Sequence, residues 1–199
     1  MTIDRVQSLS QALQTGPLCQ LEDALDAREA RAELQESWLK QGPAGASLVA
    51  LKLNMPGPYK RSPLSDQVFD LAQSDLRAYC LQAFPESLLK EDSRHTLAGE
   101  EYFALIDRPV DQLKSKLVEL EEDQELGRLM DIDCLYLDAN GQQQSLSRQA
   151  VGLPKRQCFV CQADANLCAR SRKHDFEEIY QAIAKMIVED GRIHDEETN

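Results

Sequence analysis

The chain has 199 residues, 42% hydrophobic and 28% charged, and its 34 acidic against 22 basic residues give a formal net charge of −12. This composition is typical of a soluble globular protein with a substantial core. It argues against intrinsic disorder, and the negative charge argues against general nucleic-acid binding. The sequence has no run of about 18 apolar residues to span a membrane and no signal-peptide pattern at its start, so we expect a cytoplasmic protein.

The first half of the chain alternates between helical and strand patterns. Apolar residues at helical spacing predict a helix over 21–40. Residues 47–54 are mostly apolar and predict a buried strand, and the two prolines and one glycine in residues 55–60 predict a loop. A second helix is expected from Pro63, in its first turn, to Phe84.

The pattern of residues 101–148 predicts a strand, a helix and then a two-stranded hairpin. Residues 101–107 fit a strand, and a helix is expected from Pro109 to about Leu126. Residues 129–138 predict a strand that turns at 139–141 and pairs back through 142–148. The polar residues 85–99 indicate no clear element.

A cysteine-rich segment and a final helix complete the chain. Asp175 and Glu178 form a capping-box pattern, and Gly191 is suited to end the helix that follows. The order of elements predicts an α+β fold with a mixed, mostly antiparallel sheet and helices packed on it. We expect a single domain over 1–199, with a core at about 20–150 and the Cys/basic segment and helix of 151–191 packed on that core.

Two carboxylates lie two positions apart on one predicted strand. Asp131 and Asp133 face the same side, while Ile132 between them points to the core. Paired carboxylates can hold Mg²⁺ or Mn²⁺ and so neutralise phosphate charge. A strand whose polar side simply faces solvent has the same pattern, so that alternative stays open.

Three of the six cysteines fall within eleven residues, and a histidine follows. Three thiolates and one imidazole match the tetrahedral ligand set of zinc, so the candidate ligands are Cys158, Cys161, Cys168 and His174. The chain must break near 171–173, because the last two residues cannot share one helical face. Cysteines that pack a turn are the alternative, and a redox CxxC is less favoured because a thioredoxin-like setting is absent.

Basic residues concentrate around these cysteines. Residues 148–173 carry six basic side chains against one acid, Asp164. Arginine binds phosphate oxygens through two parallel hydrogen bonds, so this imbalance predicts an anion site rather than an ordinary solvated run. Lys60 and Arg61, on the proline loop, can also meet a ligand, although an ordinary connector has the same pattern. His95 and His194 are expected to be exposed bystanders.

Three blocks of this sequence together resemble one known family. The segment KRQCFVCQADANLCARSRKH (155–174) is similar to the signature of the citrate lyase phosphoribosyl-dephospho-coenzyme A transferases, also called citrate lyase holo-acyl-carrier-protein synthases. LKLNMPGPYKRSP (51–63) and GRLMDIDCLYLD (127–138) resemble the two other blocks of that family. The resemblance covers about residues 20–190, and the cysteine block is its most specific part.

The resemblance implies a nucleotidyltransferase-type reaction. The donor would be 2′-(5″-triphosphoribosyl)-3′-dephospho-coenzyme A, the acceptor a serine of the apo acyl-carrier (gamma) subunit of citrate lyase, and the by-product pyrophosphate. For this chemistry we predict Asp131 and Asp133 as catalytic residues that hold Mg²⁺, and the Cys/His cluster as a structural element that can bind Zn²⁺. The candidate phosphate-binding residues are Lys60, Arg61, Arg128, Lys155, Arg156, Arg170 and Arg172.

Two other functions remain open at this stage. A non-enzymatic zinc-knuckle module would bind an anionic partner through the basic segment, but it would not need the aspartate pair. An aromatic content of 6% is thin for base stacking, so we expect no nucleic-acid partner. The third possibility is a different nucleotidyl or phosphoryl transferase. In the leading hypothesis, residues 148–173 bind phosphates, dock the acidic carrier, or do both.

Overall fold

The structure is a computed structural model that describes residues 2–161 and 163–193, so the prediction for His194 lies outside the described residues. Its centre is a five-stranded sheet in the order β2-β3-β1-β4-β5, and each neighbouring pair is antiparallel. The strands are β1 (Ser47–Leu53), β2 (Leu88–Thr96), β3 (Gly99–Ile106), β4 (Met130–Leu137) and β5 (Gln143–Ser145). The predicted α+β class is confirmed.

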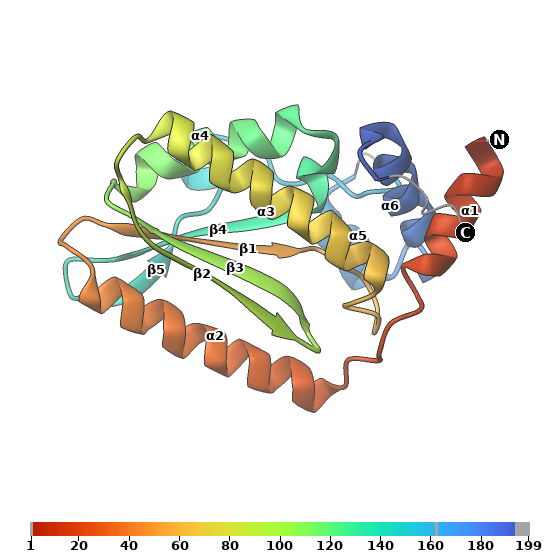
Figure 1. The fold of residues 1–199 in the computed structure, drawn as a ribbon, viewed down its shortest axis with the longest axis horizontal. Coiled ribbons are helices and arrows are strands. Elements are labelled where there is room, and N and C mark those ends of the chain that lie inside the picture. The colour runs from red at the N-terminus through yellow and green to blue at the C-terminus, as the bar shows by residue number, and fades with distance from the viewer. Residues whose placement is uncertain (1, 162, 194–199) are drawn as a thin grey trace, which may run out of the picture.

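Helices cover both faces of this sheet (Figure 1). α2 (Leu21–Gln41) covers one face, and α3 (Pro63–Ala83) and α4 (Val110–Asp123) cover the other. The remaining helices, α1 (Thr2–Ala12), α5 (Ala165–Ser171) and α6 (Phe176–Asp190), lie away from these faces. Alternate residues of β1 point to opposite faces, so Leu48 packs with Trp38 of α2, whereas Val49 packs with Phe69 of α3. The central strands are therefore buried on both sides, as the apolar run at 47–54 predicted.

The helix ends follow the chemistry of the sequence. Ser62 accepts a hydrogen bond from the Ser65 amide at 3.1 Å and so caps α3 just before Pro63. The predicted capping box of α6 is present, because Asp175 and Glu178 each accept a hydrogen bond from the other's backbone amide. α6 ends at Gly191, which has a positive φ of 73°.

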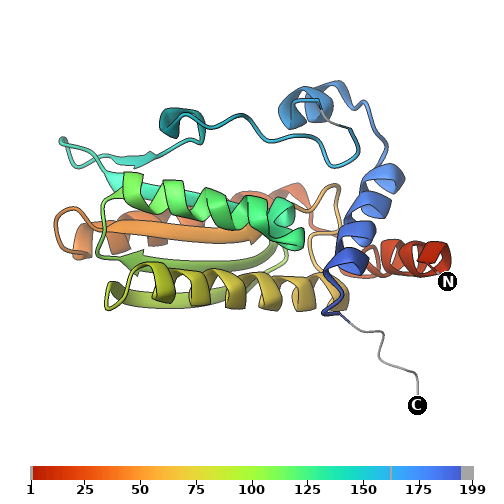
Figure 2. The same cartoon turned by 90° about the horizontal axis from the view of Figure 1, so that it is seen from above.

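Besides the short helix α5 of the cysteine-rich segment, one further helix and one strand were not predicted. The first is α1, which lies beside α6 (Figure 2). Leu9 of α1 and Leu13, directly after it, share one apolar cluster with Ile183 and Ile187 of α6. The second is β2, an edge strand whose charged and partly exposed residues gave no alternating apolar pattern. Charged side chains are ordinary on edge strands, where they discourage pairing with other chains.

The outer edge of β4 is only partly covered. The predicted return strand over 142–148 is shorter than expected, since β5 pairs only with Leu135–Leu137. Beyond it, the chain runs past β4 and α4 toward α5 (Figure 2). Within the part of the chain that the structure describes, no strand covers Met130–Asp133 on that side. No described helix is long and apolar enough to cross a membrane.

Candidate functional site

A cavity of about 640 Å³ lies between the proline loop, the end of α4 and the cysteine-rich segment. Two acidic side chains in its wall, Glu121 and Glu122, are outnumbered by six basic ones. These basic residues are Lys60, Arg128, Arg148, Lys155, Arg156 and Arg172. Five of the seven predicted phosphate-binding residues therefore meet here, whereas Arg61 and Arg170 do not line the cavity. A cationic cavity of this size suits a phosphorylated small molecule.

Glu121 holds two of these arginines in place. Its side chain is 3% exposed, and its two carboxylate oxygens accept hydrogen bonds of 2.6 Å from Arg148 and Arg156. Arg148 also pairs with the half-exposed Glu122. The sequence analysis placed Arg148 in the basic segment but not among the phosphate-binding residues. Glu121 was not recognised, because its burial depends on contacts distant in sequence.

The aspartate pair lies beside this cavity rather than in its wall. Asp131 and Asp133 project from one face of β4, while Ile132 between them is buried, as predicted. Asp131 lies 3.1 Å from Lys52 on the neighbouring strand and 3.4 Å from Arg156. Arg156 is thus both part of the cavity wall and a contact of the aspartate pair.

The electrostatics of the pair favour a cation. Desolvation by the surrounding protein and repulsion from Asp131 raise the pKa of the Asp133 carboxyl, although its side chain reaches the surface. Lys52, Lys114 and Arg156 oppose this rise. Two carboxylate groups close together on one strand face suit a hard divalent cation with oxygen ligands.

Lys114 of α4 forms a hydrogen bond with the backbone of the same strand. Its side chain is buried, at 4% exposure, and its ammonium donates a 2.9 Å hydrogen bond to the carbonyl of Ile132. This carbonyl lies between the two aspartates in sequence. The sequence analysis missed Lys114, because a lysine in a helical pattern is normally solvent-exposed.

Gly127 permits the tight turn that brings Arg128 to the cavity. A Cβ atom at Gly127 would lie 2.4 Å from the Glu121 carbonyl oxygen, too close for any side chain. Arg128 then donates a 2.7 Å hydrogen bond to the carbonyl of Cys158. The turn therefore joins the end of α4 to the cysteine-rich segment.

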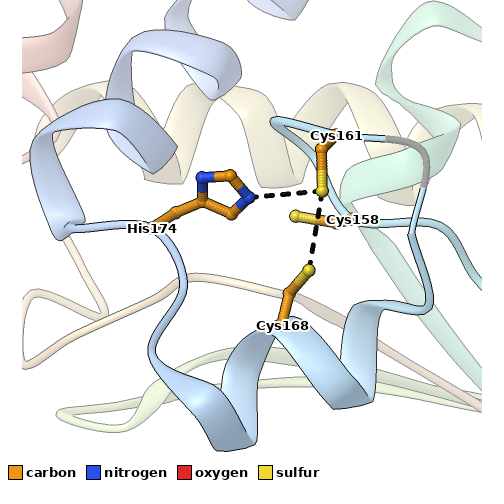
Figure 3. A group of neighbouring side chains, drawn as sticks. All are labelled: Cys158, Cys161, Cys168 and His174. Atoms are coloured by element: carbon orange, nitrogen blue, oxygen red, sulfur yellow. Dashed lines mark hydrogen bonds between the residues drawn. The ribbon is translucent and has the colours of Figure 1, made fainter.

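The four candidate metal ligands come together, with all their ligand atoms within 4.8 Å of one another (Figure 3). The sulfur of Cys161 lies 3.6 Å from that of Cys168 and 3.3 Å from Nε2 of His174. A tetrahedral zinc with bonds of about 2.3 Å would separate its sulfur ligands by about 3.7 Å. The cluster can therefore hold a metal ion such as zinc.

The local backbone and charges support this cluster. The predicted chain break is present, because α5 ends at Arg172, whose φ is +48°. The His174 interaction lowers the pKa of Cys161 to about 6, and burial raises that of Cys168 to about 11. Nδ1 of His174 lies 3.5 Å from Glu178, the kind of carboxylate contact that orients metal-bound histidines.

The residues of the proline loop have separate surroundings. Lys60 lines the cavity, donates a 2.5 Å hydrogen bond to the Met55 carbonyl, and has a pKa lowered by burial. Arg61 instead pairs with Asp66 and Glu100, each at 2.7 Å. His95 is mostly exposed, as expected, but it also contacts Glu100.

Sequence comparisons match this chain to one family. The family described as "Apo-citrate lyase phosphoribosyl-dephospho-CoA transferase" matches residues 19–190. The chain belongs to this family. A Streptococcus pyogenes serotype M18 protein, described as a "probable apo-citrate lyase phosphoribosyl-dephospho-CoA transferase", is 39% identical over 87% of this chain and 88% of its own length. A Vibrio cholerae serotype O1 protein (strain O395) with the same description is 33% identical over 83% of this chain and 90% of its own length.

Membership in this transferase family confirms the resemblance identified in the three sequence blocks. The match includes the aspartate strand, the basic cavity and the Cys/His cluster, because all of them lie within residues 19–190. It leaves out α1, which lies before the matched region.

Proposed function

We propose that this chain transfers the phosphoribosyl-dephospho-CoA group from 2′-(5″-triphosphoribosyl)-3′-dephospho-CoA to a serine of the acyl-carrier subunit of citrate lyase. The observation that carries this proposal is the position of Arg156, which lines the basic cavity and lies 3.4 Å from Asp131. A polyphosphate bound in the cavity would thereby reach the aspartate pair. The family description supports the same reaction.

The reaction forms one bond and breaks another. The serine oxygen of the carrier attacks the phosphorus of the triphosphate group that is bonded to the ribose, and the serine proton passes to solvent. The bond from that phosphorus to the oxygen of the next phosphate breaks. Pyrophosphate leaves. Negative charge grows on the leaving group, so cationic side chains stabilise the transition state where they hold its oxygens.

The chain's own residues divide this work. Arg148 and Arg156 are pre-oriented by Glu121, and Arg128 by the Cys158 carbonyl, so each reaches the phosphates with little entropy left to lose. Asp131 and Asp133 are the residues that would hold Mg²⁺, and a bound Mg²⁺ would neutralise phosphate charge. Lys52 keeps Asp131 in place through its 3.1 Å ion pair.

We further propose that Cys158, Cys161, Cys168 and His174 bind a structural zinc. The close approach of their ligand atoms supports this assignment. Cys158 and Cys161 precede α5, Cys168 lies within it, and His174 follows it. A bound zinc would therefore fix the wall of the cavity formed by these segments.

A pyrophosphate-release assay tests the proposed reaction. The purified chain, Mg²⁺, the donor and the apo carrier should release pyrophosphate, and a carrier with its acceptor serine replaced by alanine should release none. Equal release without the carrier serine would indicate a different phosphoryl transferase. The absence of release from a folded chain with a competent carrier would leave the non-enzymatic zinc-knuckle module as the better hypothesis.

A further inference from the structure

The wall of the main cavity has an apolar part that the proposed phosphate chemistry does not use. It is formed by Met55, Pro56, Phe159, Phe176 and Ile179. Most of these residues belong to or flank the apolar cluster between the proline loop and α6. Arg148 and Arg156 instead contact Glu121, near the end of α4. One cavity therefore combines an apolar, aromatic region with a cationic region.

The Cys/His cluster brings the two aromatic rings to the cavity. Phe159 directly follows Cys158, and Phe176 is two residues after His174. The ligand atoms of Cys158 and His174 approach within 4.8 Å, which anchors both segments to one point (Figure 3). Phe159 lies in a loop and Phe176 begins α6, yet the same cluster positions both.

The phenylalanine at the start of α6 is unusually exposed. Phe176 is 54% exposed and lines the cavity, whereas Met55, in the same apolar part of the wall, is buried. The proline loop approaches it closely, since a Cβ atom at Gly57 would lie 3.4 Å from its ring. Tyr180 fixes that loop by donating a 2.8 Å hydrogen bond to the Pro56 carbonyl. The ring is therefore held in place with one side uncovered.

A cation lies next to the second ring. The guanidinium of Arg128 is 5.9 Å from the centre of the Phe159 ring and is fixed to the Cys158 carbonyl. This arrangement fits a ligand in which a flat aromatic base is joined to phosphates. Aromatic side chains stack on nucleobases, and arginine binds the adjoining phosphate oxygens.

We propose that Phe159 and Phe176 form the binding site for the adenine base of the donor, with Arg128 on the diphosphate next to it. This inference rests on the proposed function for the identity of the donor. It assigns the two regions of the cavity to two parts of the same molecule. The adenosine diphosphate part lies against the aromatic region, and the triphosphate extends toward Arg156 and Asp131.

Binding measurements on fragments of the donor test this assignment without any transfer reaction. ADP, 4′-phosphopantetheine and inorganic pyrophosphate are titrated by calorimetry into the wild-type chain and into Phe176→Ala and Phe159→Ala. We expect each alanine variant to bind ADP about 5- to 100-fold more weakly. Binding of pyrophosphate should stay unchanged. Phe176→Tyr, which keeps the ring, should retain wild-type affinity for ADP.

Three results would overturn the assignment. The first is unchanged ADP affinity in both alanine variants that melt like the wild type. The second is a loss of 4′-phosphopantetheine binding with ADP binding intact, which would place the pantetheine arm on the rings. The third comes from separate initial-rate kinetics: a KM in Phe176→Ala that rises for the carrier and not for the donor would make Phe176 a carrier contact. Because none of the titrations needs turnover, a chain that binds ADP through Phe176 but transfers nothing contradicts only the proposed function.

Discussion

Arg156 connects the cavity to the aspartate strand, because its guanidinium lies 3.4 Å from the carboxylate of Asp131 while it also lines the cavity. The other end of that guanidinium is held at 2.6 Å by the buried Glu121. A single arginine is thus positioned from α4 and directed toward β4. Its orientation, and not only its charge, is important for the proposed reaction.

Removing the charge of Glu121 should weaken its hydrogen bonds to Arg148 and Arg156, so that both side chains lose their fixed orientation. We expect Glu121→Gln to lower the free energy of unfolding by about 3 kcal/mol, because a buried ion-pair partner is lost. The KM for the donor should rise more than kcat falls. Denaturant titration and initial-rate kinetics measure the two effects.

Glu122 provides the matched control for this variant. It pairs with the same Arg148 but is 52% exposed, so Glu122→Gln should change the free energy of unfolding by less than about 0.5 kcal/mol. Equal effects of the two substitutions would contradict the role of Glu121 as the residue that positions the arginines.

The aspartate pair should be essential for turnover but not for folding. We expect Asp131→Asn and Asp133→Asn each to lower kcat by on the order of 10³-fold, because stabilisation of the phosphate charge is lost. Asp92→Asn is the control, since Asp92 lies in the same cross-strand row as Asp133 at the far edge of the sheet. Full activity in either β4 variant would refute the two-carboxylate site.

Lys114 should hold the strand between those aspartates. Lys114→Met removes the hydrogen bond to the Ile132 carbonyl, so we expect a loss of about 1–3 kcal/mol in unfolding free energy and a fall in kcat. Lys116→Met, at a half-exposed position of the same helix, should behave like the wild type. Unchanged stability and kcat in Lys114→Met would show that the contact does not support the site.

Metal analysis should find about one zinc per chain. Cys161→Ser should lose the metal and lower the melting temperature, because the cluster joins the segments on both sides of α5. Cys19 lies outside the cluster, so Cys19→Ser should retain the zinc. A metal-free preparation that melts at the same temperature after chelation would make the cysteines packing residues only.

Glu100 should make the stability of the chain depend on pH. Burial raises the pKa of its carboxyl above the ordinary value, although Arg61 and His95 oppose this rise and Asp66 adds to it. The folded chain therefore holds the proton more tightly than the unfolded chain does. This contribution to stability is complete below the ordinary pKa and is lost as the pH rises through the raised one. Relative to Glu100→Gln, the unfolding free energy of the wild type should fall as the pH rises above the ordinary pKa of a glutamate, about 4.

The glutamate on the neighbouring strand should show the opposite trend. A hydrogen bond from Arg77 lowers the pKa of Glu91. Its contribution is therefore present at neutral pH and is lost as the pH falls through the lowered pKa. Relative to Glu91→Gln, the wild type should gain stability with rising pH. The same trend in both variants would contradict the assigned directions.

Local patterns predicted the main elements, and long-range contacts determined the rest. The strand β4 was predicted with the correct side chains facing the core, because alternation is a local signal. The edge strand β2 has no such signal. Glu121 and Lys114 look like solvent-exposed helix residues in the sequence, and only the packing of α4 on β4 buries them. The Cys/His spacing, in contrast, predicted the cluster and the chain break at Arg172.

The most direct test of the proposed function is the intact mass of the apo carrier subunit after incubation with this chain, Mg²⁺ and the triphosphoribosyl-dephospho-CoA donor. We predict a mass gain equal to one phosphoribosyl-dephospho-CoA group, and no gain with Asp131→Asn. An unchanged carrier mass, with a folded chain and a carrier that a known transferase of this family modifies, would contradict the proposed function.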